Sequence, residues 1–184
     1  PFCPIELALG ARATFFARGV DVDMANSAKI MVAGAKHKGT SVIEILQNCI
    51  IFNDNIHSAV SSRQAREENT ILLKHGEKML FGKDNAQGIV RDGWKLKAIT
   101  VGQDGYTIDD VLVHDAHELD SHLHLRLGLM APANGLPIAL GVIRDVVAPV
   151  YEQEVEKQIV QEKAKKPNMT LVDFLNTKNS WEMK

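Results

Sequence analysis

Cysteine is scarce in this sequence. Its 184 residues include only Cys3 and Cys49, too few for a framework of disulfide bonds. Free cysteines are typical of proteins in a reducing compartment. We therefore expect a cytoplasmic protein whose fold depends on its apolar core, since 45% of the residues are hydrophobic.

An excess of one charge is also missing. The 21 basic and 23 acidic residues leave a net charge of −2, without the basic stripe of a nucleic-acid-binding protein. No apolar run approaches the roughly 18 residues of a membrane span, and no signal peptide is visible. We therefore expect neither nucleic acid nor membrane as a partner. Because the first residue is Pro1 and not Met, we expect a chain that was processed or that begins inside a longer protein.

The common phosphate-binding and nucleophile motifs are absent as well. The sequence has no G-x-x-x-x-G-K-[ST] loop and no G-x-G-x-x-G after a strand. It also has no G-x-S-x-G elbow, so the sequence offers no nucleophile motif that would indicate a small hydrolase or transferase. Such a chain either binds no phosphorylated ligand by itself or lacks the portion that does.

The first 50 residues do carry a clear pattern of strand, helix and strand. An apolar run at 13–17 predicts a strand that ends at Arg18, and "TSVIEIL" predicts a second strand. Between them, Asp21 or Asp23 is expected to cap a helix whose apolar residues share one face, namely Met24, Ala28, Met31, Val32 and Ala35. The unit is typical of a right-handed parallel crossover. Two strands are too few for a stable parallel sheet. We therefore predict that this unit is one portion of a larger doubly wound α/β domain.

The remaining sequence changes in character after residue 56. We predict helices at 65–74, 116–130 and 150–166, short strands and turns at 75–105, a strand in "LPIALGVIRDV", and a short helix in the tail. The predicted fold is therefore α/β in two parts. Residues 1–56 form the end of the α/β domain, and residues 57–184 form a C-terminal extension.

Several polar residues could serve either structure or function. Arg18 could form a salt bridge or hold an anion at a strand end, and the salt bridge is favoured. His114, His117, His122 and His124 are expected to be structural or surface histidines, with a pH-sensitive contact or a metal site as alternatives. Cys3 lies between Pro1 and Pro4 in the sequence and is expected to be a structural thiol.

Cys49 is the most informative of these residues. It follows a predicted strand, and ligand sites form at the carboxyl ends of strands in α/β folds. A packed, inert thiol is the ordinary interpretation. An iron–sulfur cluster normally takes four thiolates, so a cluster on Cys49 would need ligands that this sequence does not supply.

Five blocks in one order resemble a known family. "PIELALGARATFFARGVDVD", "AKHKGTSVIEILQNCIIFND", "HGEKMLFGK", "GIVRDGW" and "LVHDAHE" are similar to the C-terminal half of the beta subunit of 2-oxoacid:ferredoxin oxidoreductases. The resemblance covers nearly the whole chain, and the spelling "QNCIIFND" favours the 2-oxoglutarate branch over the pyruvate branch.

The resemblance implies an enzyme that oxidatively decarboxylates a 2-oxo acid with coenzyme A and passes the electrons to ferredoxin. It implies thiamine diphosphate with Mg²⁺, a [4Fe–4S] cluster and an alpha subunit as partner. The resemblance places this chain in the thiamine diphosphate-binding domain, with Cys49 as the fourth cluster ligand and no catalytic residue of its own. Pyruvate as the substrate, or a non-catalytic interaction domain derived from the family, remain the alternatives.

The chain also departs from the family pattern. The Gly-Asp-Gly…Asn motif for metal and diphosphate is absent, and so are the three early cluster cysteines. Cys3 stands where the family usually has a polar residue, which gives no reason to treat it as a ligand. We therefore expect no thiamine diphosphate binding and no activity from this chain alone.

Overall fold

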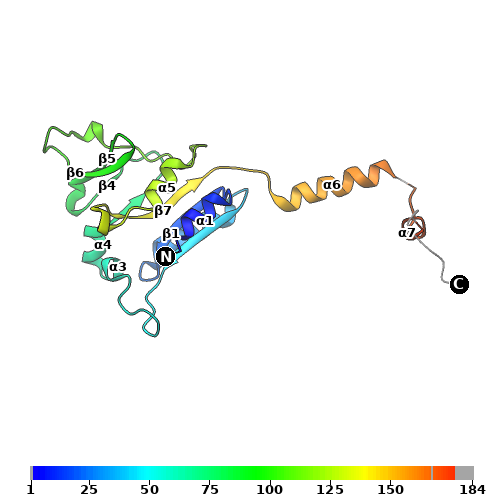
Figure 1. The fold of residues 1–184 in the computed structure, drawn as a ribbon, viewed down its shortest axis with the longest axis horizontal. Helices are drawn as coiled ribbons and strands as arrows, with labels where there is room; N and C mark the ends of the chain where they lie inside the picture. The colour runs from blue at the N-terminus through cyan, green and yellow to red at the C-terminus, as the bar shows by residue number, and fades with distance from the viewer. Residues whose placement is uncertain (1, 167, 177–184) are drawn as a thin grey trace. The chain divides into compact units, whose positions relative to one another are not determined.

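The computed structural model of the protein describes residues 2–166 and 168–176 (Figure 1). The chain divides into two compact units, Pro1–Ala148 and Pro149–Lys184. The first unit carries the two sheets, and the described part of the second unit contains two helices.

A four-stranded sheet forms the centre of the first unit. Its order is β2-β1-β7-β3, from strands Ser41–Leu46, Phe15–Val20, Ile138–Asp145 and Thr70–Leu73. The pairs β1/β2 and β3/β7 are parallel, whereas β1/β7 is antiparallel. The predicted α/β class is therefore confirmed, with a mixed and mostly parallel sheet. The sheet takes strands from both sides of residue 56, and the boundary expected there stays a prediction.

The predicted parallel crossover is also confirmed. Helix α2, Met24–Lys36, connects β1 to β2, and the Asp23 side chain caps it by accepting from the Asn26 amide at 3.2 Å. On one face of the sheet, Phe15 and Ala17 of β1 pack against Ile30 of α2.

The buried face of α2 differs from the apolar stripe seen in the sequence. Ser27, Ile30 and Gly34 are buried, while all five stripe residues are exposed. Small residues decide this orientation, because a Cβ on Gly34 would stand 2.8 Å from Ile43 Cδ1. The helix therefore approaches the sheet closely with its small side chains, and its apolar stripe is left without a partner among the described residues.

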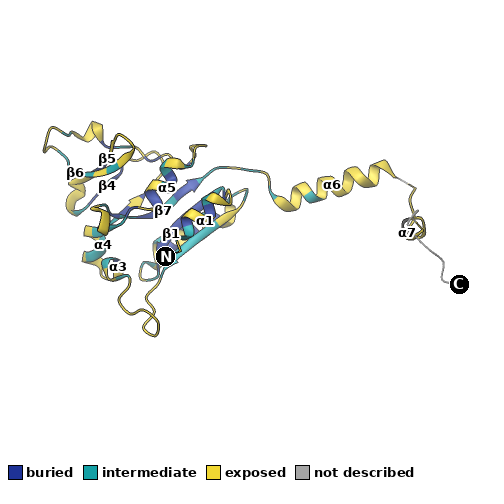
Figure 2. Ribbon diagram, in the orientation of Figure 1, coloured by how far each residue is buried: buried dark blue, intermediate teal, exposed yellow. Residues whose placement is uncertain are grey.

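The opposite face of the sheet holds the largest core. Successive strand residues point to opposite faces, so Phe16 points away from α2 and joins the cluster that contains Ile5, Leu127 and Ile143. Helices α1, Pro4–Gly10, and α5, His122–Gly128, contribute to this cluster and contact each other. Figure 2 shows the buried interior of the sheet between these layers.

A smaller antiparallel sheet confirms the predicted strands and turns. Its order is β4-β5-β6, from Leu80–Phe81, Gln87–Asp92 and Lys95–Thr100. The short helices α3, Ser58–Ser61, and α4, Arg63–Asn69, precede the sheet in sequence, and the 3-10 turns are η1 Lys83–Asn85, η2 Ile108–Asp110 and η3 Pro132–Asn134.

Two predicted helices are too long. The helix expected at 65–74 ends at Asn69, because Ile71 and Leu73 are buried in β3, which pairs with β7. The helix expected at 116–130 begins only at His122. Acidic side chains before it accept hydrogen bonds from nearby backbone, as Asp115 does from the His117 amide at 2.8 Å, and such local bonds compete with a helix.

The second unit contains helices α6, Tyr151–Lys165, and α7, Leu171–Leu175, as predicted. Glutamates occupy the first turn of α6 and lysines the last, which suits the helix dipole. None of the described residues of α6 is buried, so its apolar side chains Tyr151, Ile159 and Val160 are open to solvent (Figure 2). The end of the predicted tail lies outside the described residues. Among the described residues, no helix is long and apolar enough to cross a membrane.

Candidate functional site

Cys49 lies in the loop that follows β2, three residues beyond Leu46. Its side chain is a free thiol at the surface. The structure therefore does not show the packed, inert thiol that is the ordinary interpretation of a lone cysteine. Cys3 is a free thiol too, but it is half-buried and packs against the large core cluster, as expected of a structural residue.

Polar side chains of the loop itself hold the backbone around Cys49. Asn48 Nδ2 donates to Asp54 Oδ1 at 2.9 Å, and Asn48 Oδ1 accepts from the Asn55 amide at 2.9 Å. The Asn53 amide donates to the Cys49 carbonyl at 2.9 Å, which closes the turn between them. Asn48 therefore braces both ends of the loop and fixes the position from which the thiol projects.

Backbone amides favour the thiolate form of Cys49. Hydrogen bonds from the backbone of Phe52, then of Ile51 and last of Asn53, lower the pKa of the thiol below its usual value and outweigh the opposing effect of desolvation. The thiolate is the form that binds metals. Hydrogen bonds to a ligating sulfur are also one way in which a protein sets the reduction potential of an iron–sulfur cluster.

The donor set around Cys49 is incomplete for a cluster. A [4Fe–4S] cluster takes four thiolates. Among the residues that the structure describes, no group of three or more His, Cys, Asp or Glu side chains could hold a metal ion. Cys49 thus fits the role of one ligand, accessible and inclined to ionise. Nothing in the described parts of the chain completes the set.

Arg18 is a structural residue. It lies within β1, which continues to Val20, and pairs in register with Glu44 on β2. Its Nε donates to Glu44 Oε2 at 2.6 Å. The pair places the two charges of an otherwise apolar strand pair against each other, so the favoured salt bridge is confirmed and Arg18 is not positioned to hold an anion at a strand end.

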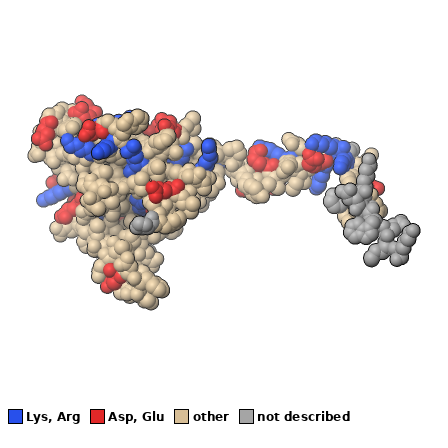
Figure 3. Space-filling model, viewed as in Figure 1, with Lys and Arg blue, Asp and Glu red and all other residues tan. Residues whose placement is uncertain are grey.

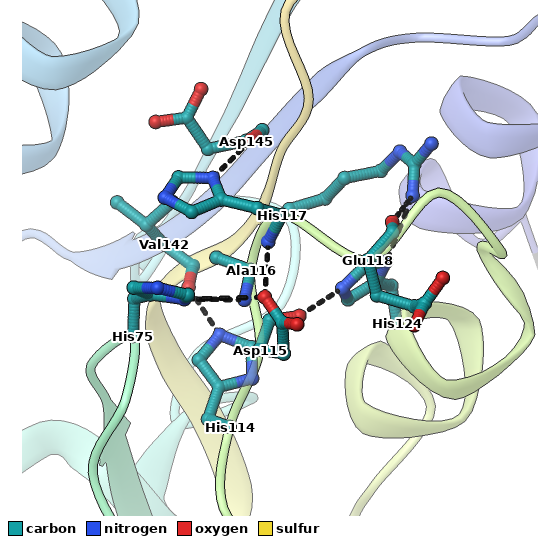
Figure 4. A network of polar contacts seen from close by, with 10 residues as sticks. His75, His114, Asp115, Ala116, His117, Glu118, His124, Val142 and Asp145 are labelled. Carbon is teal, nitrogen blue, oxygen red and sulfur yellow. Dashed lines mark hydrogen bonds and ion pairs between the residues drawn. The ribbon is translucent and has the colours of Figure 1, made fainter.

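The structural interpretation of the histidines is also confirmed. His114 and His124, both labelled in Figure 4, are each only 1% exposed, whereas His117 and His122 lie at the surface. His114 Nε2 donates to the Val142 carbonyl at 2.9 Å, and His124 Nε2 donates to the Asp115 carbonyl at 2.8 Å. Burial lowers the pKa of both rings, that of His114 to about 4. Both are therefore neutral at physiological pH.

Arg144 is the organising residue that sequence reasoning missed. Its Nη1 donates to the Glu118 carbonyl at 2.9 Å and its Nη2 to the Leu119 carbonyl at 3.0 Å, so it holds the segment before α5 against β7. Nη1 also lies 2.9 Å from His124 Nδ1. The available signal was an arginine within an apolar run, since a buried charge requires partners.

Three curated proteins put these residues in a family context. The chain is 33% identical over 183 residues to "2-oxoglutarate oxidoreductase subunit KorB" of Mycobacterium tuberculosis, an alignment that covers 98% of this chain and 48% of that relative. Shorter segments match "2-oxoacid:ferredoxin oxidoreductase subunit beta" of Saccharolobus solfataricus, 42% identical over 55 residues (30% of this chain and 18% of that protein). A segment also matches subunit beta of "2-oxoacid:ferredoxin oxidoreductase 1" of Aeropyrum pernix, 39% identical over 51 residues (28% of this chain and 16% of that protein).

No family model matches the chain, and no solved structure matches it. The chain spans about half the length of the Mycobacterium relative, and it aligns with that relative over almost all of its own length. Both the mixed α/β sheet and the shared sequence fit a part of such a subunit. Over nearly its whole length, the chain therefore matches a part of the beta subunits of 2-oxoacid:ferredoxin oxidoreductases.

Proposed function

We propose that this chain forms part of a beta subunit that oxidatively decarboxylates a 2-oxo acid to an acyl-CoA and passes electrons through a [4Fe–4S] cluster to ferredoxin. Cys49 is the proposed cluster ligand. One observation carries the proposal: the thiol is exposed directly after a strand and has its pKa lowered by three backbone amides. A surface thiol held in this way suits metal ligation better than packing.

The substrate and partners are proposed from the relatives. 2-Oxoglutarate is favoured because the sequence around Cys49 leans to that branch and the Mycobacterium relative is named for it. An alpha subunit and ferredoxin are the proposed protein partners, and coenzyme A is the proposed acyl acceptor. The two free cysteines support a cytoplasmic location.

The chain itself contributes positioning and electrostatics. When bound, a [4Fe–4S] cluster supplies one-electron transfer. Asn48 fixes the loop, Cys49 provides one thiolate, and the amides of Ile51 and Phe52 stabilise the negative charge on its sulfur. The chain lacks the Gly-Asp-Gly…Asn motif, so none of its residues is assigned to thiamine diphosphate or Mg²⁺.

The decisive experiment substitutes Cys49→Ser in the complete beta subunit, purified with its alpha subunit. We expect loss of the cluster's visible absorbance and of 2-oxoglutarate-dependent ferredoxin reduction. Cys3→Ser is the matched control, because Cys3 packs in the core and should leave both signals in place. Unchanged absorbance and turnover in Cys49→Ser would refute the role of Cys49. Faster turnover with pyruvate than with 2-oxoglutarate would assign the other branch.

A further inference from the structure

A cavity of about 500 Å³ opens between the end of α1, the start of β1 and the segment before α5. Two arginines, Arg12 and Arg144, and two hydroxyl residues, Thr14 and Ser121, line it, and none of its described lining residues is acidic. Over the face of the first unit that Figure 3 shows, acidic and basic side chains are interspersed. The cavity therefore combines an unusual concentration of positive charge with a volume typical of small-molecule sites.

Arg144 is the buried charge of this cavity. It is only 8% exposed, and its described hydrogen bonds go to the Glu118 carbonyl, the Leu119 carbonyl and His124 Nδ1, all of which are uncharged acceptors. Burial lowers the pKa of Arg144, because removal from water disfavours the charged form, yet an arginine stays protonated at physiological pH. A buried charge ordinarily has a counter-charge, and Arg144 has none among its described partners.

The carboxylates nearby are engaged elsewhere. The charges of Asp120 and Glu118 act on Arg144, but neither forms an ion pair with it in the described parts of the chain. Asp120 Oδ1 accepts from the His122 amide at 2.8 Å, and Glu118 Oε1 accepts from the Asp120 amide at 3.1 Å. The guanidinium of Arg144 therefore keeps its attraction for an anion.

Arg144 also has hydrogen-bond donors to spare. A guanidinium carries five N–H groups. The contacts with Glu118 and His124 use both N–H groups of Nη1, and the contact with Leu119 uses one of Nη2. The buried Nε has no hydrogen-bond partner among the described residues. One N–H group on Nε and one on Nη2 are thus left, and a carboxylate or phosphate accepts two such donors at once.

Arg12 and Ser121 add further donors to the cavity. Arg12 adopts the left-handed conformation, with φ of 63°, directly after the C-cap residue Ala11, where glycine is usual. Its side chain is exposed and makes no hydrogen bond or ion pair with the described residues. Ser121 is the N-cap residue of α5, yet its hydroxyl does not cap that helix. A ligand could therefore recruit both side chains without breaking an existing contact.

We propose that this cavity binds a small oxyanion, either a phosphate group or a carboxylate, between the guanidinium groups of Arg144 and Arg12, with the Ser121 hydroxyl as a further donor. The oxyanion supplies the counter-charge of Arg144 and strengthens the attachment of the segment before α5 to β7. The cavity lies where β1 begins, at the opposite end of the parallel pair β1/β2 from Cys49. The proposal therefore goes beyond the electron transfer proposed above and does not rest on it.

The test titrates inorganic phosphate into the chain with isotope-labelled arginine, at constant ionic strength set by chloride. We expect a saturable shift of the Arg144 Nε signal in nuclear magnetic resonance. Arg12→Gly should weaken phosphate binding about tenfold, because it removes a charged donor. Glycine suits the left-handed conformation at this position, so that variant keeps the fold. Arg126→Met is the matched control, because Arg126 is exposed on α5 and is not among the residues that line the cavity.

A second titration with acetate identifies the chemistry of the oxyanion. Tighter binding of phosphate supports a phosphate-bearing ligand, and tighter binding of acetate supports a carboxylate. The proposal would be overturned if neither anion shifts the Arg144 Nε signal, if chloride shifts it equally, or if Arg126→Met weakens binding as much as Arg12→Gly. Cys49→Ser should bind phosphate like the natural chain. A failure of the cluster function would therefore leave this result intact, and a failure of oxyanion binding would leave the spectroscopic test of Cys49 intact.

Discussion

Arg144 and His124 form a buried hydrogen bond in which Nη1 of the arginine lies 2.9 Å from Nδ1 of the histidine. Only the neutral ring accepts this bond, because its other nitrogen donates to the Asp115 carbonyl. A proton on His124 would remove the acceptor and place two positive charges in contact. The attachment of the segment before α5 to β7 therefore depends on a neutral histidine.

The first prediction concerns how the stability of the folded chain depends on pH. The pKa of His114 is about 4 in the folded chain, below the value near 6.5 of an unfolded histidine, and the pKa of His124 is also lowered. The unfolded chain thus takes up protons first as pH falls. The folded state should be most stable above about pH 6.5 and lose up to about 3 kcal/mol through His114 between pH 6.5 and 4.

Urea unfolding at pH 7.5 and 5.0 measures the part of this loss that falls above pH 5. His114→Gln should show a smaller difference between the two pH values than the natural chain. His122→Gln is the control, because His122 is exposed and its removal leaves the buried pair unchanged. The charges of His124, His75 and Asp115 also act on the ring of His114. Equal pH dependence in His114→Gln and the natural chain would contradict the prediction.

The second prediction concerns the clasp made by Arg144. Arg144→Met should destabilise the first unit by about 2–4 kcal/mol, because the carbonyls of Glu118 and Leu119 lose their donor. Arg126→Met on the exposed side of α5 should change stability by less than about 0.5 kcal/mol. Thermal or urea unfolding gives both values. A similar small effect for both arginines would show that the clasp is dispensable.

The third prediction concerns the pair Arg18 and Glu44, whose side chains are 7% and 17% exposed. Glu44→Gln should cost about 3–5 kcal/mol, because it leaves the buried guanidinium without a counter-charge. Replacing both residues, as in Arg18→Met with Glu44→Leu, should recover most of that loss.

The exposed pair of Lys74 and Glu77 is the matched comparison for that series. Both side chains are more than half exposed, so Glu77→Gln should cost less than about 1 kcal/mol. Chemical unfolding of the three variants and the natural chain separates the cost of burying an unpaired charge from the mere loss of an ion pair. A double variant at 18 and 44 as unstable as Glu44→Gln would argue that packing around the pair decides the cost.

Local sequence signals predicted the crossover unit well. An apolar run indicated β1, apolar residues on one helical face indicated α2, and a β-branched run indicated β2. Asp23, which caps α2, was one of the two cap candidates. Orientation was less accessible, because the helix packs through Ser27 and Gly34, whose small size contributes little to an apolar pattern. Strand β3 resembled a continuation of α4, since only its pairing with β7, almost 70 residues away, makes it a strand.

The candidate site shows the same division. Position after a strand singled out Cys49, but its exposure and the amides that favour its thiolate depend on the loop conformation set by Asn48. The hydrogen bonds of Arg144 join β7 to a segment about 25 residues away, a relationship that no periodicity encodes. Long-range polar contacts required the structure, whereas local capping and strand signals did not.

The fourth prediction concerns the reactivity of Cys49 in the chain itself. Cys49 should react with iodoacetamide at pH 7 faster than Cys3, because it is exposed and its amide hydrogen bonds lower its pKa. Asn48→Ala removes the brace of the loop and should slow the reaction of Cys49 by loosening those amides, while Cys3 reacts as before. Mass spectrometry of peptides from a timed reaction reports both rates. Faster modification of Cys3, or an unchanged Cys49 rate in Asn48→Ala, would show that the loop does not activate the thiol.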